Sequence, residues 1–182
     1  MMGMVFTELL EMVEEKFSMD VVDRVLARAG ARGSYTSVGN YEDAELFALV
    51  GALSAESGIA VPDLLHAYGS HLFGRFYAMF PHFFDAHTDA PSFLRGLESH
   101  VHTEVRKLYP VAHPPLFTST DRPEGGLDLD YRSRRALGDF ARGLLEACLG
   151  HYGGAHRLLD VQDLSDGAGT HLRFAIVPAH EG

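Results

Sequence analysis

The sequence predicts an α+β protein, in which a helical N-terminal lobe packs on a C-terminal lobe with a small antiparallel sheet and a long helix. Two observations predict this division. Up to Pro110, apolar residues recur at helical spacing between proline and glycine breaks. Beyond Pro110, short alternating segments surround glycine turns and one helical stretch. The chain of 182 residues is expected to form one domain over 1–182, with lobes at about 1–60 and 61–182.

Five helices are expected in the first part of the chain. Apolar residues at helical spacing predict the first two, and acidic residues in the first turn support the third, because the helix dipole favours negative charge there. Pro62 and Pro91 suit the first turns of the fourth and fifth, and Pro110 closes the fifth. The five helices are expected around 6–13, 21–26, 41–57, 62–80 and 91–110.

The second part of the chain is expected to alternate between strands and one helix. Branched and aromatic residues between proline and glycine turns predict short extended segments. A long apolar stripe followed by Gly153 predicts the helix, and a glycine-containing turn at 165–169 predicts a final hairpin. The expected extended segments are 116–118, 127–131, 157–164 and 170–177, and the helix covers about 134–152.

Composition excludes several classes of protein. Hydrophobic residues at 46% and charged residues at 22% are typical of a globular protein, and a net charge of -10 argues against a nucleic-acid partner. One cysteine excludes an internal disulfide and a cysteine-based zinc site. The N-terminal segment is apolar but rich in glutamate, unlike a signal peptide, and no stretch approaches the ~20 apolar residues of a membrane span. We therefore expect a cytoplasmic protein without membrane contact.

His102 is the first candidate binding residue among the eleven histidines. On a helical wheel it falls at the edge of an apolar stripe that includes Leu94 and Val105, whereas His100 falls outside the stripe. A neutral imidazole in this position can ligate iron. The alternative is a histidine at the edge of the core that donates to a backbone carbonyl, and the pattern alone favours this alternative.

The segment Tyr131-x-Ser133-x-Arg135 is the second candidate. Residues two apart in an extended segment face the same side, so the three polar groups can converge. Arginine offers a bidentate fork to a carboxylate, and the two hydroxyl groups add single donors. The alternative is a solvated strand edge with ordinary surface arginines. Together, an imidazole and a carboxylate-binding tripod match the iron and the two propionates of haem, which makes haem binding the leading hypothesis.

These residues belong to a longer pattern. In chain order it consists of His102, Tyr109-Pro110, Pro114-Pro115-x-Phe117 and Tyr131-x-Ser133-x-Arg135. The pattern resembles the haem-nitric oxide/oxygen binding (H-NOX) family, which includes the haem domain of soluble guanylate cyclase and stand-alone bacterial sensors. The resemblance covers nearly the whole chain, including Gly3 and the segment 71–81.

The resemblance implies a haem b cofactor, ferrous iron protoporphyrin IX, held between the two lobes. It makes His102 the sole protein ligand to the iron and assigns the propionates to Tyr131, Ser133 and Arg135. Pro115 matches the proline that presses on the porphyrin and bends it out of plane. Pro114 is expected to be a turn residue.

The resemblance also implies a gas preference. Relatives that hold oxygen place a tyrosine hydroxyl over the bound gas, because bound oxygen carries partial negative charge and needs a donor. Phe140 matches that position and cannot donate. The other expected distal residues are apolar: Val5, Leu9, Leu72 and Leu144. Tyr77 or His71 would change this preference if either turned inward, although His71 is expected on the helix surface.

These residues predict a haem-based sensor of nitric oxide, with weaker carbon monoxide binding and little or no oxygen binding, and not an enzyme. Release of His102 and relaxation of strain near Pro115 would carry the signal. The output would be a separate protein, by analogy with bacterial relatives a histidine kinase or a cyclic-di-GMP enzyme. The alternatives are a haem-dependent enzyme acting on nitric oxide or peroxide, a haem carrier, and a haem-free interaction module.

Overall fold

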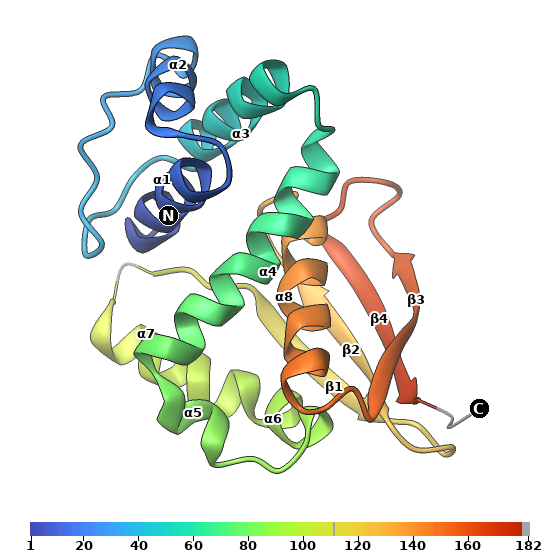
Figure 1. Ribbon diagram of the computed structural model, residues 1–182. Coiled ribbons are helices and arrows are strands. Elements are labelled where there is room, and N and C mark those ends of the chain that lie inside the picture. The colour runs from blue at the N-terminus through green and yellow to red at the C-terminus, as the bar shows by residue number, and fades with distance from the viewer. Residues whose placement is uncertain (111, 180–182) are drawn as a thin grey trace.

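The structure is a computed structural model that describes residues 1–110 and 112–179. Three helices form the N-terminal part, at the upper left of Figure 1: α1 (Met4–Lys16), α2 (Met19–Ala29) and α3 (Asp43–Ser57). Ser18 starts α2, because its side chain accepts a hydrogen bond from the Val21 amide at 3.4 Å. Gly30 ends α2 in the left-handed conformation, with φ of 65°.

Two long helices, α4 (Val61–Met79) and α8 (Gly138–His151), lie side by side through the middle of the molecule (Figure 1). Glycines permit their close approach. A Cβ atom at Gly69 would lie 2.1 Å from the Phe140 carbonyl oxygen, and one at Gly143 would lie 2.0 Å from the His66 carbonyl oxygen. Only residues without a side chain fit at these two crossing points.

The expected fifth helix is divided into three pieces. These are α6 (Ala90–Gly96), the π-helix η1 (Leu97–His102) and α7 (Thr103–Leu108). A π turn bonds residues five apart, so a helical wheel with one constant step does not hold across it. A short helix that the sequence pattern did not predict, α5 (Pro81–Asp85), fills the connection after α4.

The four strands form one antiparallel sheet in the order β1-β2-β4-β3. Their bounds are β1 (Leu116–Asp121), β2 (Leu127–Arg132), β3 (His156–Asp163) and β4 (His171–Pro178). Tyr131 on β2 lies opposite Phe117 on β1 and Leu172 on β4. Leu127, Leu129 and Tyr131 alternate inward and pack with residues of α8, which covers this face of the sheet (Figure 1).

The predicted α+β fold is confirmed, including the small antiparallel sheet, the C-terminal hairpin and the long C-terminal helix. Helix α8 begins at Gly138, later than the expected 134, because residues 133–137 form a loop that carries part of the candidate site. Apolar residues pack into two cores, one around α1–α3 and the first half of α4, the other between α8 and the sheet. The single-domain division near residue 60 stays a prediction.

Within the described residues, no single helix is long and apolar enough to span a membrane. The pair α3 and α4 reaches that length and composition only when taken together, and the two helices are bent by 112° at their junction.

Candidate functional site

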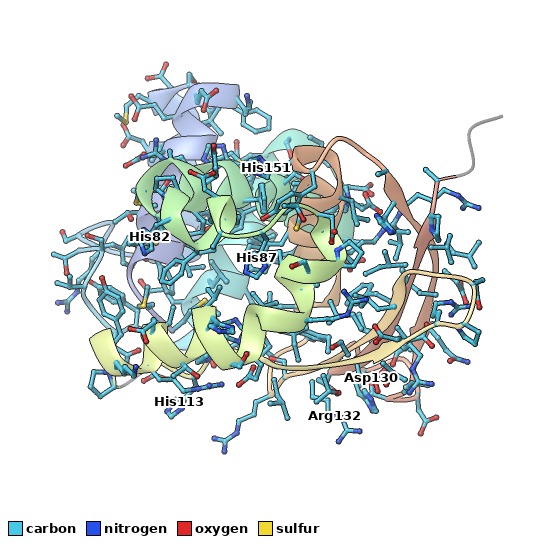
Figure 2. The ribbon with its side chains drawn as sticks, turned by 90° about the horizontal axis from the view of Figure 1, so that it is seen from below. His82, His87, His113, Asp130, Arg132 and His151 are labelled. Carbon is cyan, nitrogen blue, oxygen red and sulfur yellow. The ribbon has the colours of Figure 1, made fainter. Side chains whose placement is uncertain are left out.

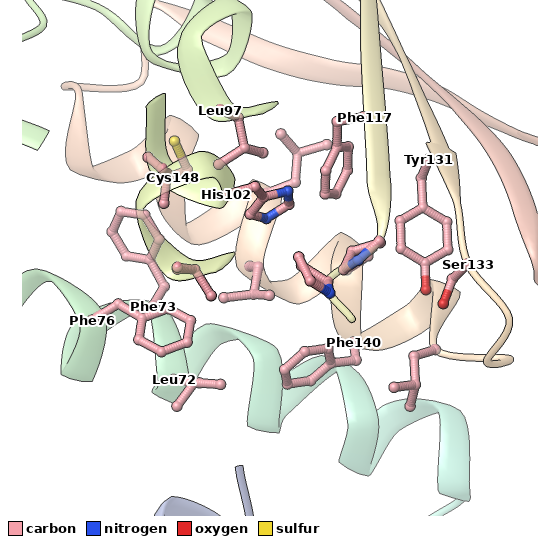
Figure 3. Close-up of a pocket in the computed structure, with 18 of the residues that line it drawn as sticks. Leu72, Phe73, Phe76, Leu97, His102, Phe117, Tyr131, Ser133, Phe140 and Cys148 are labelled. Carbon is pink, nitrogen blue, oxygen red and sulfur yellow. The ribbon is translucent and has the colours of Figure 1, made fainter. Parts of the chain in front are cut away.

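A cavity of about 300 Å³ lies where α1, α4, α8, the run from α6 to α7, and the sheet meet (Figure 3). Most of its lining is apolar. Its polar lining residues within the described part of the chain come chiefly from the run between η1 and the loop after β2: His102, Tyr109, His113, Tyr131, Ser133 and Arg135. A cavity of this size, with a few converging polar groups, is the usual form of a small-molecule or cofactor site.

His102 occupies the last position of η1 and lines the cavity (Figure 3). Its side chain is only 12% exposed, so the π turn buries a residue that the helical wheel places at the edge of the apolar stripe. Nδ1 lies 3.0 Å from Oε2 of Glu98. Burial lowers the pKa of His102, and the Glu98 carboxylate opposes this only in part. The ring is therefore neutral at pH 7, as an iron ligand must be.

Glu98 is a polar neighbour of His102 that the sequence pattern did not single out. Besides His102, it accepts hydrogen bonds from the backbone nitrogen of Phe117 at 3.3 Å and from Arg106 at 2.5 Å. Burial raises the pKa of Glu98, but these hydrogen bonds outweigh burial and hold the pKa below its usual value. Glu98 is therefore an ionised carboxylate that joins the helix to strand β1.

Tyr131, Ser133 and Arg135 all line the cavity, so the structure brings the expected tripod together. Figure 3 shows the hydroxyl groups of Tyr131 and Ser133 next to one another. The Ser133 Oγ accepts from the Arg135 amide at 3.0 Å, and the Tyr131 hydroxyl donates to the Arg135 carbonyl at 3.5 Å. Burial raises the pKa of Tyr131, which keeps its hydroxyl protonated as a donor.

The Arg135 guanidinium contacts both the loop that carries His113 and the start of α3. Its Nη1 donates to the His113 carbonyl at 2.8 Å, and its Nε lies 2.7 Å from Oδ2 of Asp43 at the start of α3. The amino group of Met1 lies 3.3 Å from the other oxygen of Asp43. Burial raises the pKa of Asp43, but these two cations lower it further than burial raises it. An ion pair thus links the N-terminal helices to the tripod.

Pro115 lines the same cavity as His102 and the tripod, and its expected contact with a porphyrin stays a prediction. Pro114, which was expected only to form a turn, also lines the cavity. Phe117 follows on β1, with its ring 5.7 Å from the His102 ring and 5.6 Å from the Tyr131 ring between centroids. These aromatic contacts connect the histidine to the sheet.

The opposite wall carries four of the five expected distal residues. Val5, Leu72, Phe140 and Leu144 line the cavity, together with Phe73 and Phe76. Leu9 is the exception: it is not among the described lining residues but is buried in the core of the N-terminal helices. Its place in the distal pocket therefore stays a prediction.

The distal wall offers no side-chain hydrogen-bond donor among the described lining residues. Tyr68 lies beside Phe140, with ring centroids 5.2 Å apart, but its hydroxyl donates to the Val5 carbonyl and does not line the cavity. Tyr77 packs on His151 and Phe84 and is not among the described lining residues. The wall is therefore apolar, as expected.

His71 does not lie on the helix surface as predicted. Its side chain is 14% exposed and sits between α4 and α1, with Nε2 and Nδ1 each 4.0 Å from carboxylate oxygens of Glu8 and Glu15. It is absent from the described lining of the cavity, so it does not supply a distal donor.

The mouth of the cavity is basic, although the chain as a whole is acidic. An open pocket beside the tripod is lined by four arginines and His113, and no carboxylate is among its described lining residues. Figure 2 shows His113 and Arg132 along the lower edge of that view. Cationic groups at the mouth suit the carboxylates of a bound ligand.

The donor set fits a haem. An imidazole held at Nδ1 by Glu98 lines an apolar cavity, and hydroxyl and guanidinium groups gather at the mouth. Among the described residues, no group of three His, Cys, Asp or Glu side chains is arranged to hold a metal ion.

A family model of haem-NO-binding proteins (HNOB) matches residues 2–157. The chain belongs to the haem-NO-binding family. The predicted membership of the H-NOX family is therefore confirmed. A comparison with curated proteins gives no match.

Solved H-NOX proteins share the fold over the whole chain. An unliganded Fe(II) H-NOX from K. algicida is 31% identical, with a TM-score of 0.91 over 100% of this chain and 98% of that one. An H-NOX from Shewanella woodyi, bound to IWP-051 in the Fe(II)CO state, is 33% identical, with a TM-score of 0.83 over 100% and 96%. An H-NOX from S. oneidensis in the Fe(II)NO state is 26% identical, with a TM-score of 0.89 over 99% and 100%.

Proposed function

We propose that the protein is a haem-based gas sensor that binds nitric oxide, and carbon monoxide more weakly, at ferrous haem, and that it is not an enzyme. The observation that carries the proposal is the position of His102, whose Nδ1 is held by Glu98 while its ring lines an apolar cavity. H-NOX relatives in Fe(II)NO and Fe(II)CO states give it further support. Tyr131, Ser133 and Arg135 would bind the propionates, and Pro115 would press on the porphyrin.

The cofactor we propose is haem b, held without a covalent link to the chain. A c-type attachment uses a C-x-x-C-H motif, and this chain has one cysteine. When bound, ferrous haem would supply an iron that can bind a diatomic gas. The apolar distal wall of Val5, Leu72, Phe140 and Leu144 then disfavours oxygen, because it provides no donor for the partial negative charge of bound oxygen.

The chain would transmit the signal through the helix that carries His102. This residue ends η1 and directly precedes α7, so its release would free both segments from the cavity wall. Two such arrangements of one helix form a two-state element, whose balance a gas can shift when it favours one arrangement. The partner we propose is a histidine kinase or a cyclic-di-GMP enzyme that contacts the altered surface.

An absorption spectrum of the purified ferrous protein tests this function. We expect a haem Soret band that shifts with nitric oxide and with carbon monoxide but shows no stable oxygen complex in air. Absence of the band, even after haem reconstitution, would contradict the function as a whole. A stable oxygen complex would keep the cofactor and contradict the role of the distal wall, and rapid loss of haem to apomyoglobin would indicate a carrier.

A further inference from the structure

Glu98 lies four residues before His102 and directs both carboxylate oxygens at donors from three elements. Its Oε2 lies 3.0 Å from Nδ1 of His102 and 3.3 Å from the backbone nitrogen of Phe117 on β1. Its Oε1 lies 2.5 Å from Nη2 of Arg106 on α7. An ionised carboxylate can only accept hydrogen bonds. Donors from η1, β1 and α7 therefore fix Glu98 in one orientation.

The contact with Glu98 decides which nitrogen of the His102 ring carries the proton. Because the carboxylate accepts, Nδ1 is the donor, and the lone pair of the neutral ring resides on Nε2. Glu98 is the side chain that holds the ring through Nδ1, the Pro115 carbonyl also raises the pKa of the ring, and the ring lines the cavity. The ring is thus set in the tautomer that can ligate iron before any cofactor arrives.

We propose that Glu98 is a positioning residue for His102, which fixes the Nδ1–H tautomer and increases the donor strength of Nε2 toward iron. The inference rests on the proposed function, since it concerns a haem iron. Carboxylates that accept from metal-ligating histidines hold the ring in orientation and raise its basicity. The iron–His102 bond would therefore be stronger than with a neutral acceptor on Nδ1. His102 would then be released in a smaller fraction of the protein molecules when nitric oxide is added.

Arg106 acts on the same carboxylate in the opposite direction. Its guanidinium draws negative charge toward Oε1 and away from Oε2, the oxygen that accepts from His102. Removal of the Arg106 charge should strengthen the iron–His102 bond, whereas removal of the Glu98 charge should weaken it. A merely structural ion pair would not give opposite shifts, because loss of either partner would loosen the same contact.

Resonance Raman spectroscopy of the ferrous, haem-loaded full chain measures the iron–histidine stretching frequency. We expect Glu98→Gln to lower this frequency and Arg106→Gln to raise it. The reduction potential should move the other way, upward in Glu98→Gln and downward in Arg106→Gln, because a less anionic ligand stabilises ferric iron less. Glu104→Gln is the matched control: it removes a carboxylate that accepts from Lys107 at 2.6 Å on α7, with a side chain 44% exposed.

An unchanged frequency and potential in Glu98→Gln would overturn the proposal, as would shifts of the same sign in both variants. If Glu98→Gln fails to hold haem, Arg106→Gln decides alone: a raised frequency supports the inference and an unchanged one contradicts it. The proposed function fails separately, when the unmodified chain holds no haem or when His102→Gly leaves the iron–histidine band in place.

Discussion

The two walls of the cavity are held by different forces. Directional bonds fix the wall that carries His102: Glu98 accepts from three donors, and Arg135 joins His113 to Asp43. Apolar packing fixes the side chains of the opposite wall, where the described lining residues are apolar and the Tyr68 hydroxyl donates to the backbone carbonyl of Val5. From this comparison we infer that, under the proposed function, separate residues would control retention of the haem and choice of the gas. Substitutions in the first wall should change haem content, and those in the second should change gas affinity.

The largest expected effect comes from His102→Ala. Loss of the ligand should accelerate haem dissociation by more than about 100-fold, because even outer-shell partners of a metal ligand are worth about 10–100-fold. Soret absorbance per protein, with and without added imidazole, measures the effect. The matched control is His100→Ala, which removes an exposed imidazole from the same π-helix. Equal haem content in both variants would place the ligand elsewhere.

Arg135→Ala should lower haem affinity roughly tenfold, since hydrogen bonds to charged groups contribute about 1.5–3 kcal/mol. Transfer of haem to apomyoglobin gives the dissociation rate. Arg134→Ala is the control, because Arg134 is exposed and adjacent. Asp43→Asn distinguishes the contact of Arg135 with Asp43 from its proposed contact with the propionates. If this variant weakens haem binding as much as Arg135→Ala does, the loss reflects the contact with Asp43 and not the propionates.

Phe140→Tyr tests the distal wall. A hydroxyl at this position should introduce measurable oxygen affinity, with a gain of up to about tenfold, because a neutral hydrogen bond contributes about 0.5–1.5 kcal/mol. Haem content should stay unchanged, in contrast to the variants of the first wall. Oxygen titration of the ferrous protein measures the effect, and Phe140→Leu serves as the control without a hydroxyl. Equal oxygen binding in the two variants would speak against the assigned position.

The smallest effect should come from His71, behind the distal wall. Burial lowers its pKa, although Glu15 and Glu8 partly oppose this and Arg75 adds to it. The folded state therefore binds fewer protons than the unfolded state below the unfolded pKa of about 6.5. Stability should be full above that pH and should fall as pH drops from there toward the folded pKa.

Urea unfolding at pH 8 and pH 5.5 measures this dependence in the unmodified chain and in His71→Gln. The variant should lose less stability between the two pH values. A difference between the two proteins that stays constant with pH would show that His71 does not titrate in this range.

The sequence predicts the fold well where the residues of a single helix or hairpin determine that element. Stripes of apolar residues predict α4 and α8, and the glycine-containing turn at 165–169 predicts the β3–β4 hairpin. Contacts between distant segments leave no such periodicity. The pairing of Arg135 with Asp43 joins residues far apart in the chain. Likewise, the π turn of η1 changes the direction of His102 and Glu98 without an apolar signature of its own.

The candidate site was predicted mainly through its motif. His102, Pro115 and the tripod line one cavity, because the motif residues lie on segments that the fold brings together. Leu9 is buried in the N-terminal core and is not among the described lining residues, because helical spacing does not determine how α1 meets its neighbours. Glu98 was missed because a glutamate four residues before a histidine is also the ordinary pattern of a solvated helix face.

Cys148, the chain's one cysteine, lies in this cavity wall, where it is 2% exposed and burial raises the pKa of its thiol to about 12. Alkylating reagents should therefore reach this thiol only slowly, as the pocket opens. The rate at which the Cys148 thiol is alkylated therefore measures how often the pocket opens. A ligand that binds only the closed form should lower this alkylation rate in proportion to the ratio of its concentration to its Kd. Alkylation of this one thiol can therefore report the binding of a ligand that has no chromophore.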